Sequence, residues 1–286
     1  MAVKTTAATL DAEDTALNET SQDLVDMFDE MGFLRFARLL SPATCKTLRD
    51  YILKDLESNL EEDEKETESR FSNIRERSHR WDFKLHDSPI VRQTMREVLT
   101  HNKFLQSILA PLCQCSSEEE VANVVLAELG ALVSEPGAKN QEWHADTAHT
   151  GPTEPDCICC FITLQETPAS MGPTQLIPQT HTVDFHTSTL SNFPPKGLLP
   201  TTLQPKSMQN GFCSSGDALL MDCRLYHRGS ANTYTLKNDC DLNEGKRVVF
   251  YFTVRSSREP RPAGFLFTIL KELNDKPLVD FLEHAL

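Results

Sequence analysis

The sequence predicts an α+β protein in which antiparallel sheets form a sandwich or an open barrel, with early helices packed on one outer face. Apolar residues recur at helical spacing up to about residue 110. Beyond about residue 120 the chain changes to short β-rich runs bounded by Pro, Gly, Asn and Asp. It contains no internal repeat and no glycine-rich phosphate loop, which excludes the nucleotide-binding α/β folds.

Three helices are expected in the first part of the chain. One covers residues 21–31 and ends at Gly32, and a second opens at Pro42, where the missing N–H of proline costs nothing. A third covers 88–110 and is ended by Pro111.

Strands are expected in five apolar runs, over 121–134, 157–164, 174–178, 216–222 and 246–254. In the last of these, alternation puts one fully apolar set of residues on one face: Val248, Phe250, Phe252 and Val254. Arg247 begins the other face. A cation there is costly to bury unless an anion meets it, so Arg247 is a candidate anion-binding residue.

The domain organisation is expected to be simple. We predict a flexible tail over residues 1–20 and a single domain over 21–286, with its helical part at about 21–120 and its barrel at about 121–256. A chain of 286 residues with 39% apolar residues can bury one large core.

The net charge of −14 comes mostly from two acidic segments, 1–30 and 57–70, which together carry −12. The rest of the chain is nearly neutral and has no basic stripe, which argues against a nucleic-acid partner. No apolar run is long enough to span a membrane.

The terminal segments and the pattern of cysteines favour a cytoplasmic protein. The N-terminus has neither the apolar stretch of a signal peptide nor the arginines of a transit peptide, and the final tripeptide is not a peroxisomal signal. The nine cysteines lack paired CxxC knuckles, so we expect free thiols in a reducing compartment.

The candidate chemistry begins at His144-Ala145-Asp146. In an extended segment, residues two apart point to the same side, so His144 and Asp146 can bind one metal together. His227 follows an apolar strand 83 residues later, and this pairing of HxD with a distant His builds the facial triad of non-heme Fe(II) oxygenases. Arg247, twenty residues further on, suits the far carboxylate of a dicarboxylate cosubstrate.

Several motifs in the right order resemble the phytanoyl-CoA dioxygenase family of Fe(II)/2-oxoglutarate oxygenases, over residues 22–256. Residues 143–146 match its Trp-His-x-Asp motif. Residues 172–181 match Gly-Pro-(x)3-Ile-Pro-Gly-(Ser/Thr)-His, except for Gln179 in place of Gly. Residues 28–41 and 135–137 are similar to the family's N-terminal signature and to its approach to the iron motif.

The resemblance implies a double-stranded β-helix, a jelly-roll or cupin-like barrel, with the N-terminal helices on its outer face. It implies Fe(II) and 2-oxoglutarate as cofactor and cosubstrate, O2 as oxidant, and hydroxylation of a small-molecule or acyl-type substrate with release of succinate and CO2. Related halogenases lack the carboxylate, so Asp146 favours hydroxylation. The implied iron ligands are His144, Asp146 and His227, and the implied 2-oxoglutarate contacts are Arg247, Ser230 and Asn232.

Alternatives remain for some of these roles. The insertion over 233–246 lengthens the gap between His227 and the arginine, so Arg224 or Arg255 could replace Arg247. Ser230 and Asn232 either contact the cosubstrate or only shape a turn.

Other residues have a structural and a functional interpretation. His181 is expected to stabilise a turn, Trp143 to pack beside the iron motif, and His149 to pack or to face the substrate. A basic cluster is interpreted chiefly as a surface loop, with the mouth of the site as the alternative: Arg75, Arg77, Arg80 and Lys84.

Two rival functions stay open. One is a catalytically silent barrel that acts as a binding or sensing module, and the other is a cupin-type metalloenzyme that does not use 2-oxoglutarate. The substrate and the oligomeric state are not predicted.

Overall fold

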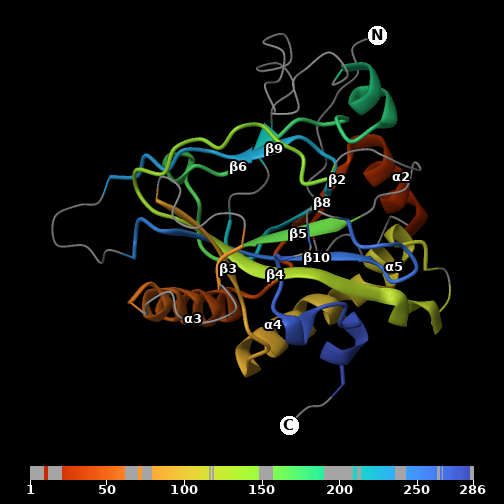
Figure 1. The fold of residues 1–286 in the computed structure, drawn as a ribbon, viewed down its shortest axis with the longest axis horizontal. Coiled ribbons are helices and arrows are strands. Elements are labelled where there is room, and N and C mark those ends of the chain that lie inside the picture. Colours follow the sequence, from red (N-terminus) through yellow and green to blue (C-terminus); the bar gives the residue numbers. More distant parts are fainter. Residues whose placement is uncertain are drawn as a thin grey trace.

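Seven strands form one sheet, and helices from the first part of the chain cover one of its faces (Figure 1). The structure is a computed structural model, and it describes residues 10–11, 21–61, 70–72, 79–115, 117, 119–147, 157–189, 209–210, 214–235, 243–262, 265 and 267–283. Within these residues the protein is a mixed α/β structure with a largely antiparallel sheet, which agrees with the predicted order of helices first and strands afterwards.

The strands are β1 (Leu10–Asp11), β2 (Phe33–Ala37), β3 (Arg80–Lys84), β4 (Val124–Ser134), β5 (Ile158–Thr163), β6 (Thr174–Leu176), β7 (Gln209–Asn210), β8 (Ala218–Asp222), β9 (His227–Gly229) and β10 (Arg247–Ser256). The seven-stranded sheet has the order β1-β2-β8-β5-β10-β4-β3, and a three-stranded sheet has the order β7-β6-β9. The five predicted strands are confirmed as β4, β5, β6, β8 and β10, whereas β1, β2, β3, β7 and β9 were not predicted.

The α-helices are α2 (Ser21–Met31), α3 (Pro42–Glu61), α4 (Pro89–Thr100) and α5 (Ala110–Leu112). Short 3₁₀ or π turns are η1 (His101–Lys103), η2 (Leu105–Leu109), η3 (Glu119–Asn123), η4 (Ala169–Met171), η5 (Phe185–Thr189), η8 (Lys271–Leu273) and η9 (Leu278–Phe281).

The predicted helix boundaries agree with the structure except at Pro111. Gly32 ends α2 with φ of 81°, a left-handed conformation that favours glycine, and Pro42 is the first residue of α3. The expected break at Pro111 is wrong. Pro111 lies in the first turn of α5, where it needs no N–H partner, and the regular helix is interrupted earlier, at Asn102 with φ of 46°.

The two faces of β10 have different surroundings, as the alternation predicted. Val248 and Phe250 belong to the large core cluster that also contains the apolar residues of α3 and α4. Val249 and Tyr251 belong to a second cluster, which includes Leu176 of the three-stranded sheet. In Figure 1, α3 and α4 lie on one side of the seven-stranded sheet, and β6 and β9 lie on the other. The face that carries Arg247 therefore looks toward the smaller sheet.

The start of the chain adds one element to the sheet. Leu10 and Asp11 fall within the segment predicted as a flexible tail, and they pair in parallel with Phe36 and Ala37 as strand β1. The rest of residues 1–20 lies outside the described residues.

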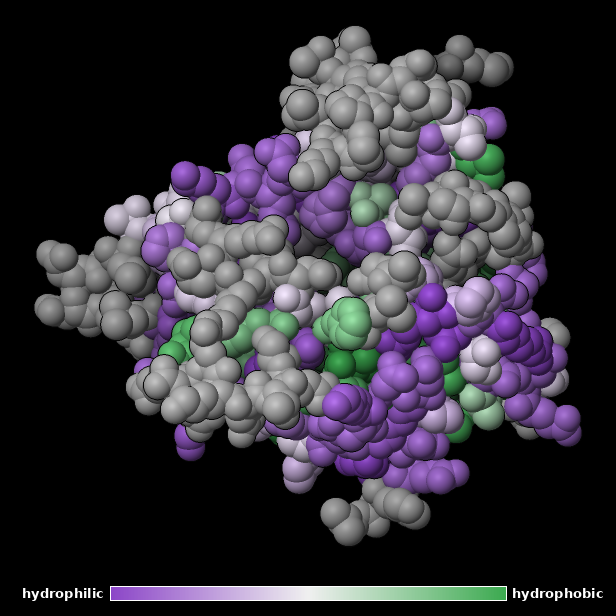
Figure 2. Space-filling view, viewed as in Figure 1, coloured by the Kyte–Doolittle hydropathy of each residue, from purple (hydrophilic) through white to green (hydrophobic). Residues whose placement is uncertain are grey.

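The described surface is mainly hydrophilic, with hydrophobic atoms visible chiefly near the middle of the view in Figure 2. Among the described large apolar residues, Leu60 and Phe267 are exposed. None of the described helices has the length and apolar character needed to cross a lipid bilayer.

Gly130 provides the first testable feature, because the Tyr251 ring lies directly over it on the inner face. A Cβ at this position would come within 2.9 Å of both the Tyr251 ring and the Phe83 carbonyl oxygen. We expect Gly130→Ala to lower the free energy of unfolding by about 1–3 kcal/mol through overpacking. Urea denaturation followed by circular dichroism measures this change, and an unchanged midpoint would show that the sheet is looser here than described.

Candidate functional site

Two backbone hydrogen bonds join His144 to His227 across 83 residues of sequence. The N–H of His144 donates to the carbonyl of His227 at 3.1 Å, and the N–H of His227 donates to the carbonyl of His144 at 2.9 Å. The two residues thus form an isolated antiparallel bridge, and their rings lie side by side with centroids 4.5 Å apart.

Asp146 joins the two imidazoles because it lies two residues after His144 in an extended segment. Its Oδ1 lies 3.8 Å from Nε2 of His144 and 3.8 Å from Nε2 of His227. The N–H of Asp146 is held by the carbonyl of Cys223 at 2.8 Å. The three predicted ligand atoms all lie within 4.8 Å of one another, a spacing that a single metal ion can bridge.

Hydrogen bonds fix which nitrogen of each histidine is free. Nδ1 of His144 lies 2.8 Å from the Glu142 carbonyl, and Nδ1 of His227 lies 2.9 Å from the Leu225 carbonyl. A carbonyl can only accept, so each Nδ1 carries the proton and each Nε2 keeps its lone pair for a metal. Burial lowers the pKa of His227, which also favours the neutral ligand form.

The three side chains differ in exposure. His227 is buried, whereas the side chains of His144 and Asp146 are 38% and 27% exposed. An ion can therefore reach the site from the side of the HxD segment.

A cavity of about 610 Å³ lies against the triad. Its walls come from the inner faces of β3, β4, β5 and β10 and from the segment before His144. The side chains that the following argument uses are Arg80, Asp82, Glu128, Glu142, Phe161, Arg247, Tyr251 and Phe265.

Arg247 is buried in the wall of this cavity without a carboxylate partner. Its Nη1 donates to the carbonyl of Gly172, its Nη2 lies 3.5 Å from the Ser134 hydroxyl, and its Nε has no partner. Two acids that could balance such a charge have other partners, because Asp222 pairs with Arg224 and Asp217 accepts from backbone N–H groups.

Arg80 is a second buried arginine in the same cavity. Its Nη2 donates to the carbonyls of Lys139 and Ser230 at 3.1 and 3.0 Å, and its Nη1 has no partner. Arg80 and Arg247 both pair in register with Ser134, from the two strands that flank β4. Within the described residues, neither arginine forms a salt bridge.

Burial of these two cations is unfavourable in the absence of an anion. Desolvation lowers the pKa of Arg247 to about 9, with the neighbouring charge of Arg80 as a second cause. Desolvation also lowers the pKa of Arg80 to about 10. A bound anion would relieve both the desolvation and the mutual repulsion.

Ser230 and Asn232, the other predicted cosubstrate contacts, have different surroundings. The Ser230 hydroxyl is buried without a partner, beside its own carbonyl that binds Arg80. The Asn232 amide N–H groups donate to the carbonyls of Ser134 and Gly245, at 3.0 and 2.9 Å. Both side-chain N–H groups of Asn232 are thus bonded to backbone carbonyls, an arrangement that favours the interpretation as a residue that shapes the turn.

The arginines considered as replacements for Arg247 are both paired. Arg224 forms a buried salt bridge with Asp222 at 2.6 Å, and Arg255 pairs with Asp275 at 2.7 Å. Of the three candidates, Arg247 is the one that lines the cavity.

The basic cluster was interpreted chiefly as a surface loop, and this interpretation is wrong for Arg80 and Lys84. Both residues are buried on β3, and Arg80 lines the cavity, whereas Arg75 and Arg77 lie outside the described residues. The signal was an alternation: Trp81 and Phe83 belong to the helix-side core, whereas Arg80 and Asp82 line the cavity.

The remaining predicted residues have structural roles or are not described. Trp143 packs against Ile177 and Tyr226, with the Arg228 guanidinium 4.5 Å over its ring. Nε2 of the buried His181 lies 3.0 Å from the Asp29 carbonyl of α2, so its side chain contacts that helix and not its own turn. His149 lies outside the described residues.

Gln179 is the residue that departs from the family motif, and its backbone conformation is the one that the motif's glycine would favour. It stands where the motif has glycine and adopts φ of 65°, the left-handed region that glycine favours.

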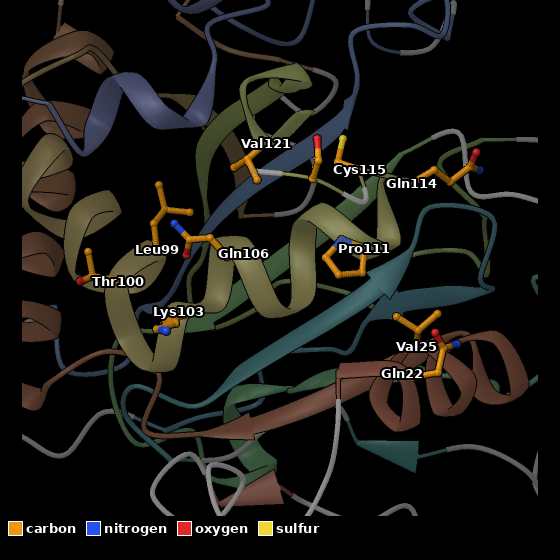
Figure 3. Close-up of a pocket in the computed structure, with 11 residues that line it drawn as sticks. Gln22, Val25, Leu99, Thr100, Lys103, Gln106, Pro111, Gln114, Cys115 and Val121 are labelled. Carbon is orange, nitrogen blue, oxygen red and sulfur yellow. The ribbon is translucent and has the colours of Figure 1, made fainter. Parts of the chain in front are cut away.

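A second cavity of about 850 Å³ lies among the helices (Figure 3). Gln22 and Val25 of α2 face residues of α4 and of the turns that follow it, such as Leu99 and Gln106. None of its eleven lining residues is a histidine or a carboxylate, so it offers no comparable set of metal ligands.

Comparison with known proteins identifies related folds. The family model of phytanoyl-CoA dioxygenase (PhyH) matches residues 28–234. AviO1 from Streptomyces viridochromogenes Tue57 has a TM-score of 0.55 at 16% identity, covering 86% of this chain and 99% of AviO1. HygX from Streptomyces hygroscopicus, solved with nickel and 2-oxoglutarate bound, has a TM-score of 0.55 at 13% identity, covering 91% and 98%.

A third similar structure is SnoN, a non-heme alpha-ketoglutarate-dependent epimerase from nogalamycin biosynthesis. It has a TM-score of 0.51 at 15% identity and covers 82% of this chain and 83% of SnoN. No curated protein sequence matches the chain.

The triad geometry predicts the effect of removing a ligand. His144→Ala should weaken Ni(II) binding at least about 100-fold, because the remaining two side chains cannot complete the site. The His144 side chain is partly exposed, so the variant should stay folded. Anaerobic isothermal titration calorimetry measures the affinity. His86→Ala removes a half-exposed imidazole that pairs with Glu272 and should bind Ni(II) like the wild type; equal binding by all three proteins would exclude the triad as the metal site.

Proposed function

Because this chain belongs to the phytanoyl-CoA dioxygenase family, we propose that it is a non-heme Fe(II)- and 2-oxoglutarate-dependent dioxygenase. It hydroxylates a small-molecule or acyl-type substrate with release of succinate and CO2. One observation carries the proposal: His144, Asp146 and His227 converge in a cavity whose wall contains two buried arginines that pair with none of the described carboxylates.

The donor set fits Fe(II). Two neutral imidazoles and one carboxylate form the ligand set of the non-heme Fe(II) oxygenases, which leaves coordination positions open for other ligands. Because Asp146 supplies one negative charge, Fe(II) at this site keeps a net charge of +1, which attracts an anionic cosubstrate.

The cavity wall fits the far carboxylate of 2-oxoglutarate. Three buried polar groups there have an atom without a hydrogen-bond partner, namely Nε of Arg247, Nη1 of Arg80 and the hydroxyl of Ser230. All three can donate, and a carboxylate has enough lone pairs to accept from each. The single negative charge of this carboxylate would also reduce the repulsion between the two guanidinium groups.

Glycine leaves room for this arrangement at Gly229. A Cβ there would lie 2.5 Å from Nη1 of Arg80 and 2.6 Å from Oε1 of Gln141. Gln141 in turn accepts the N–H of Gly229 at 2.7 Å, which fixes the segment before His144 against β9.

When bound, Fe(II) and 2-oxoglutarate supply the oxidation of a substrate C–H bond by O2, coupled to decarboxylation of the cosubstrate. The chain contributes positioning. His144 and His227 present Nε2, Arg80 and Arg247 orient the cosubstrate, and the side chains of Phe161 and Tyr251 exclude water from the cavity.

The proposal extends to the fold and the location. The two sheets together correspond to the double-stranded β-helix that the family resemblance implies, within a single domain over residues 21–286. The seven described cysteines are free and buried, which supports a reducing compartment such as the cytoplasm.

The rival functions differ in what they require of the site. A silent binding module needs neither the three ligands nor the free Nε2 atoms. A cupin-type enzyme without 2-oxoglutarate has no use for Arg247, which lines the cavity here. SnoN is described as an epimerase, so a related oxidation without hydroxylation is the alternative outcome on the same site.

The first prediction concerns the chelate itself. Anaerobic addition of Fe(II) and 2-oxoglutarate to the protein should give the weak visible charge-transfer band of the iron chelate, and O2 should then yield succinate. Absorbance spectroscopy and quantification of succinate measure the two steps. A folded protein that binds Fe(II) but gives no band would favour the cupin-type alternative, and a band without succinate in any substrate screen would favour the silent module.

The second prediction tests whether the two arginines bind 2-oxoglutarate without contributing to metal binding. Arg80→Leu and Arg247→Leu should each weaken 2-oxoglutarate binding by about 10–150-fold, the effect of losing a hydrogen bond to a charged group. Metal affinity should change little. Calorimetric titration of the Ni(II)-loaded proteins with 2-oxoglutarate measures the effect. Arg258→Leu removes an exposed arginine that pairs with Glu120 and is the matched control. If both cavity variants bound 2-oxoglutarate with wild-type affinity, the role of Arg80 and Arg247 in binding the cosubstrate would be refuted.

A further inference from the structure

The cavity beside the triad contains a buried carboxyl that binds neither the metal nor the cosubstrate in this scheme. Glu128 on β4 lines the cavity and is only 7% exposed. The pairing between β4 and β10 passes from Glu128 opposite Thr253 to Leu126 opposite Val254, so Ala127 is an extra residue, a β-bulge. Leu126 faces the helix-side core, and the bulge turns Glu128 to the inner face.

No cation neutralises Glu128. Its Oε2 accepts from the Thr253 hydroxyl at 2.7 Å, and none of the described arginines, lysines or histidines lies within salt-bridge distance of it. Arg80 and Arg247 line the same cavity and also lack carboxylate partners. Opposite charges attract each other strongly in a low-dielectric cavity. Because Glu128 is not paired with Arg80 or Arg247, the two arginines and Glu128 are each available to bind a separate ligand.

The surroundings of Glu128 favour a cation. Desolvation, followed by the nearby charges of Asp82 and Asp146, raises the pKa of Glu128 to about 8, although hydrogen bonds from the Thr253 and Thr268 hydroxyls act in the opposite direction. Asp82 is also buried, and its Oδ1 accepts from the Tyr251 hydroxyl at 2.6 Å. A cationic ligand would stabilise the ionised form of Glu128 and offset its desolvation.

Aromatic rings complete this side of the cavity. Phe161, Tyr251 and Phe265 line it together with Glu128, and the rings of Phe161 and Tyr251 have centroids 5.9 Å apart. Aromatic faces attract cations, particularly where water is excluded.

We propose that the substrate carries a protonated amine and that Glu128 is the residue that binds it, with Asp82 and the aromatic rings forming the rest of the subsite. This inference rests on the proposed function, since it assigns the arginine wall to 2-oxoglutarate and the carboxyl wall to the substrate. It narrows the substrate class to amine-bearing small molecules, because an acyl-CoA would bring further negative charge to two buried acids.

The test uses the full chain loaded with Ni(II) and 2-oxoglutarate, so that binding is measured without turnover. The probes are primary amines from methylamine to benzylamine, each compared with the alcohol of the same carbon skeleton, by isothermal titration calorimetry. At least one amine should bind about tenfold or more tightly than its alcohol, the preference expected of a charge-assisted hydrogen bond. The absence of such a preference across the series would overturn the proposal.

Two variants test which carboxylate causes the preference for an amine over its alcohol. Glu128→Gln keeps the size of the side chain and should reduce the preference to less than about twofold. Glu272→Gln removes a half-exposed carboxylate that does not line the cavity and should keep the preference. A preference that survives in Glu128→Gln, or is lost equally in Glu272→Gln, would overturn the assignment.

A second measurement does not depend on a variant. Burial raises the pKa of the Glu128 carboxyl, so binding of an ammonium group beside it should release part of its proton, whereas alcohol binding should not. Titrations in buffers of different ionisation enthalpy measure this release. Prior binding of Ni(II) and 2-oxoglutarate is checked in the same experiment: its failure refutes the proposed function, and its success without amine preference refutes only the amine subsite.

Discussion

The paired backbone hydrogen bonds between His144 and His227 are the constraint on which the site depends. Residues that exchange both bonds in an antiparallel bridge have Cα atoms about 5.5 Å apart and side chains on the same face. Leu176 of β6 pairs with His227 from the other side, so the distal histidine is held between two segments. Asp146 then follows from the two-residue period of an extended chain, and the hydrogen bond from its N–H to the Cys223 carbonyl holds it in place.

A second constraint is the burial of charge without a partner. Arg80, Arg247 and Glu128 are each more than nine-tenths buried, and none is paired with an opposite charge among the described residues. Such groups destabilise a folded protein unless a ligand meets them, and functional sites are where proteins tolerate that cost. The arginines and the acid lie on different strands of one sheet, so a rigid scaffold keeps ligand-binding groups of opposite sign from neutralising each other.

Sequence patterns predicted the parts of the site that depend on local periodicity. The alternation in β10 identified Arg247 as facing inward, and the two-residue spacing of His144 and Asp146 identified a shared side. The pairing with His227 came from motif order and from the strand that precedes it. Because these signals depend on spacing and motif order along the chain, they can be detected in a single sequence.

The parts that were missed depend on tertiary contacts. Charges at every second position of β3 resembled a loop, although Trp81 and Phe83 alternate with them, so Arg80 was given a surface role. β9 has three residues, too few for a pattern. The function of Asn232 is decided by the carbonyls of Ser134 and Gly245, which no spacing predicts, and the position of Glu128 depends on a bulge at Ala127.

A crystal structure of the protein loaded with Ni(II) and 2-oxoglutarate tests the central claim most directly. The account predicts a single ion bound by Nε2 of His144, Nε2 of His227 and the Asp146 carboxylate at about 2.0–2.2 Å. It also predicts the far carboxylate of 2-oxoglutarate within hydrogen-bond distance of Arg247 and Arg80. An ion bound elsewhere, or a cosubstrate turned away from both arginines, would contradict it.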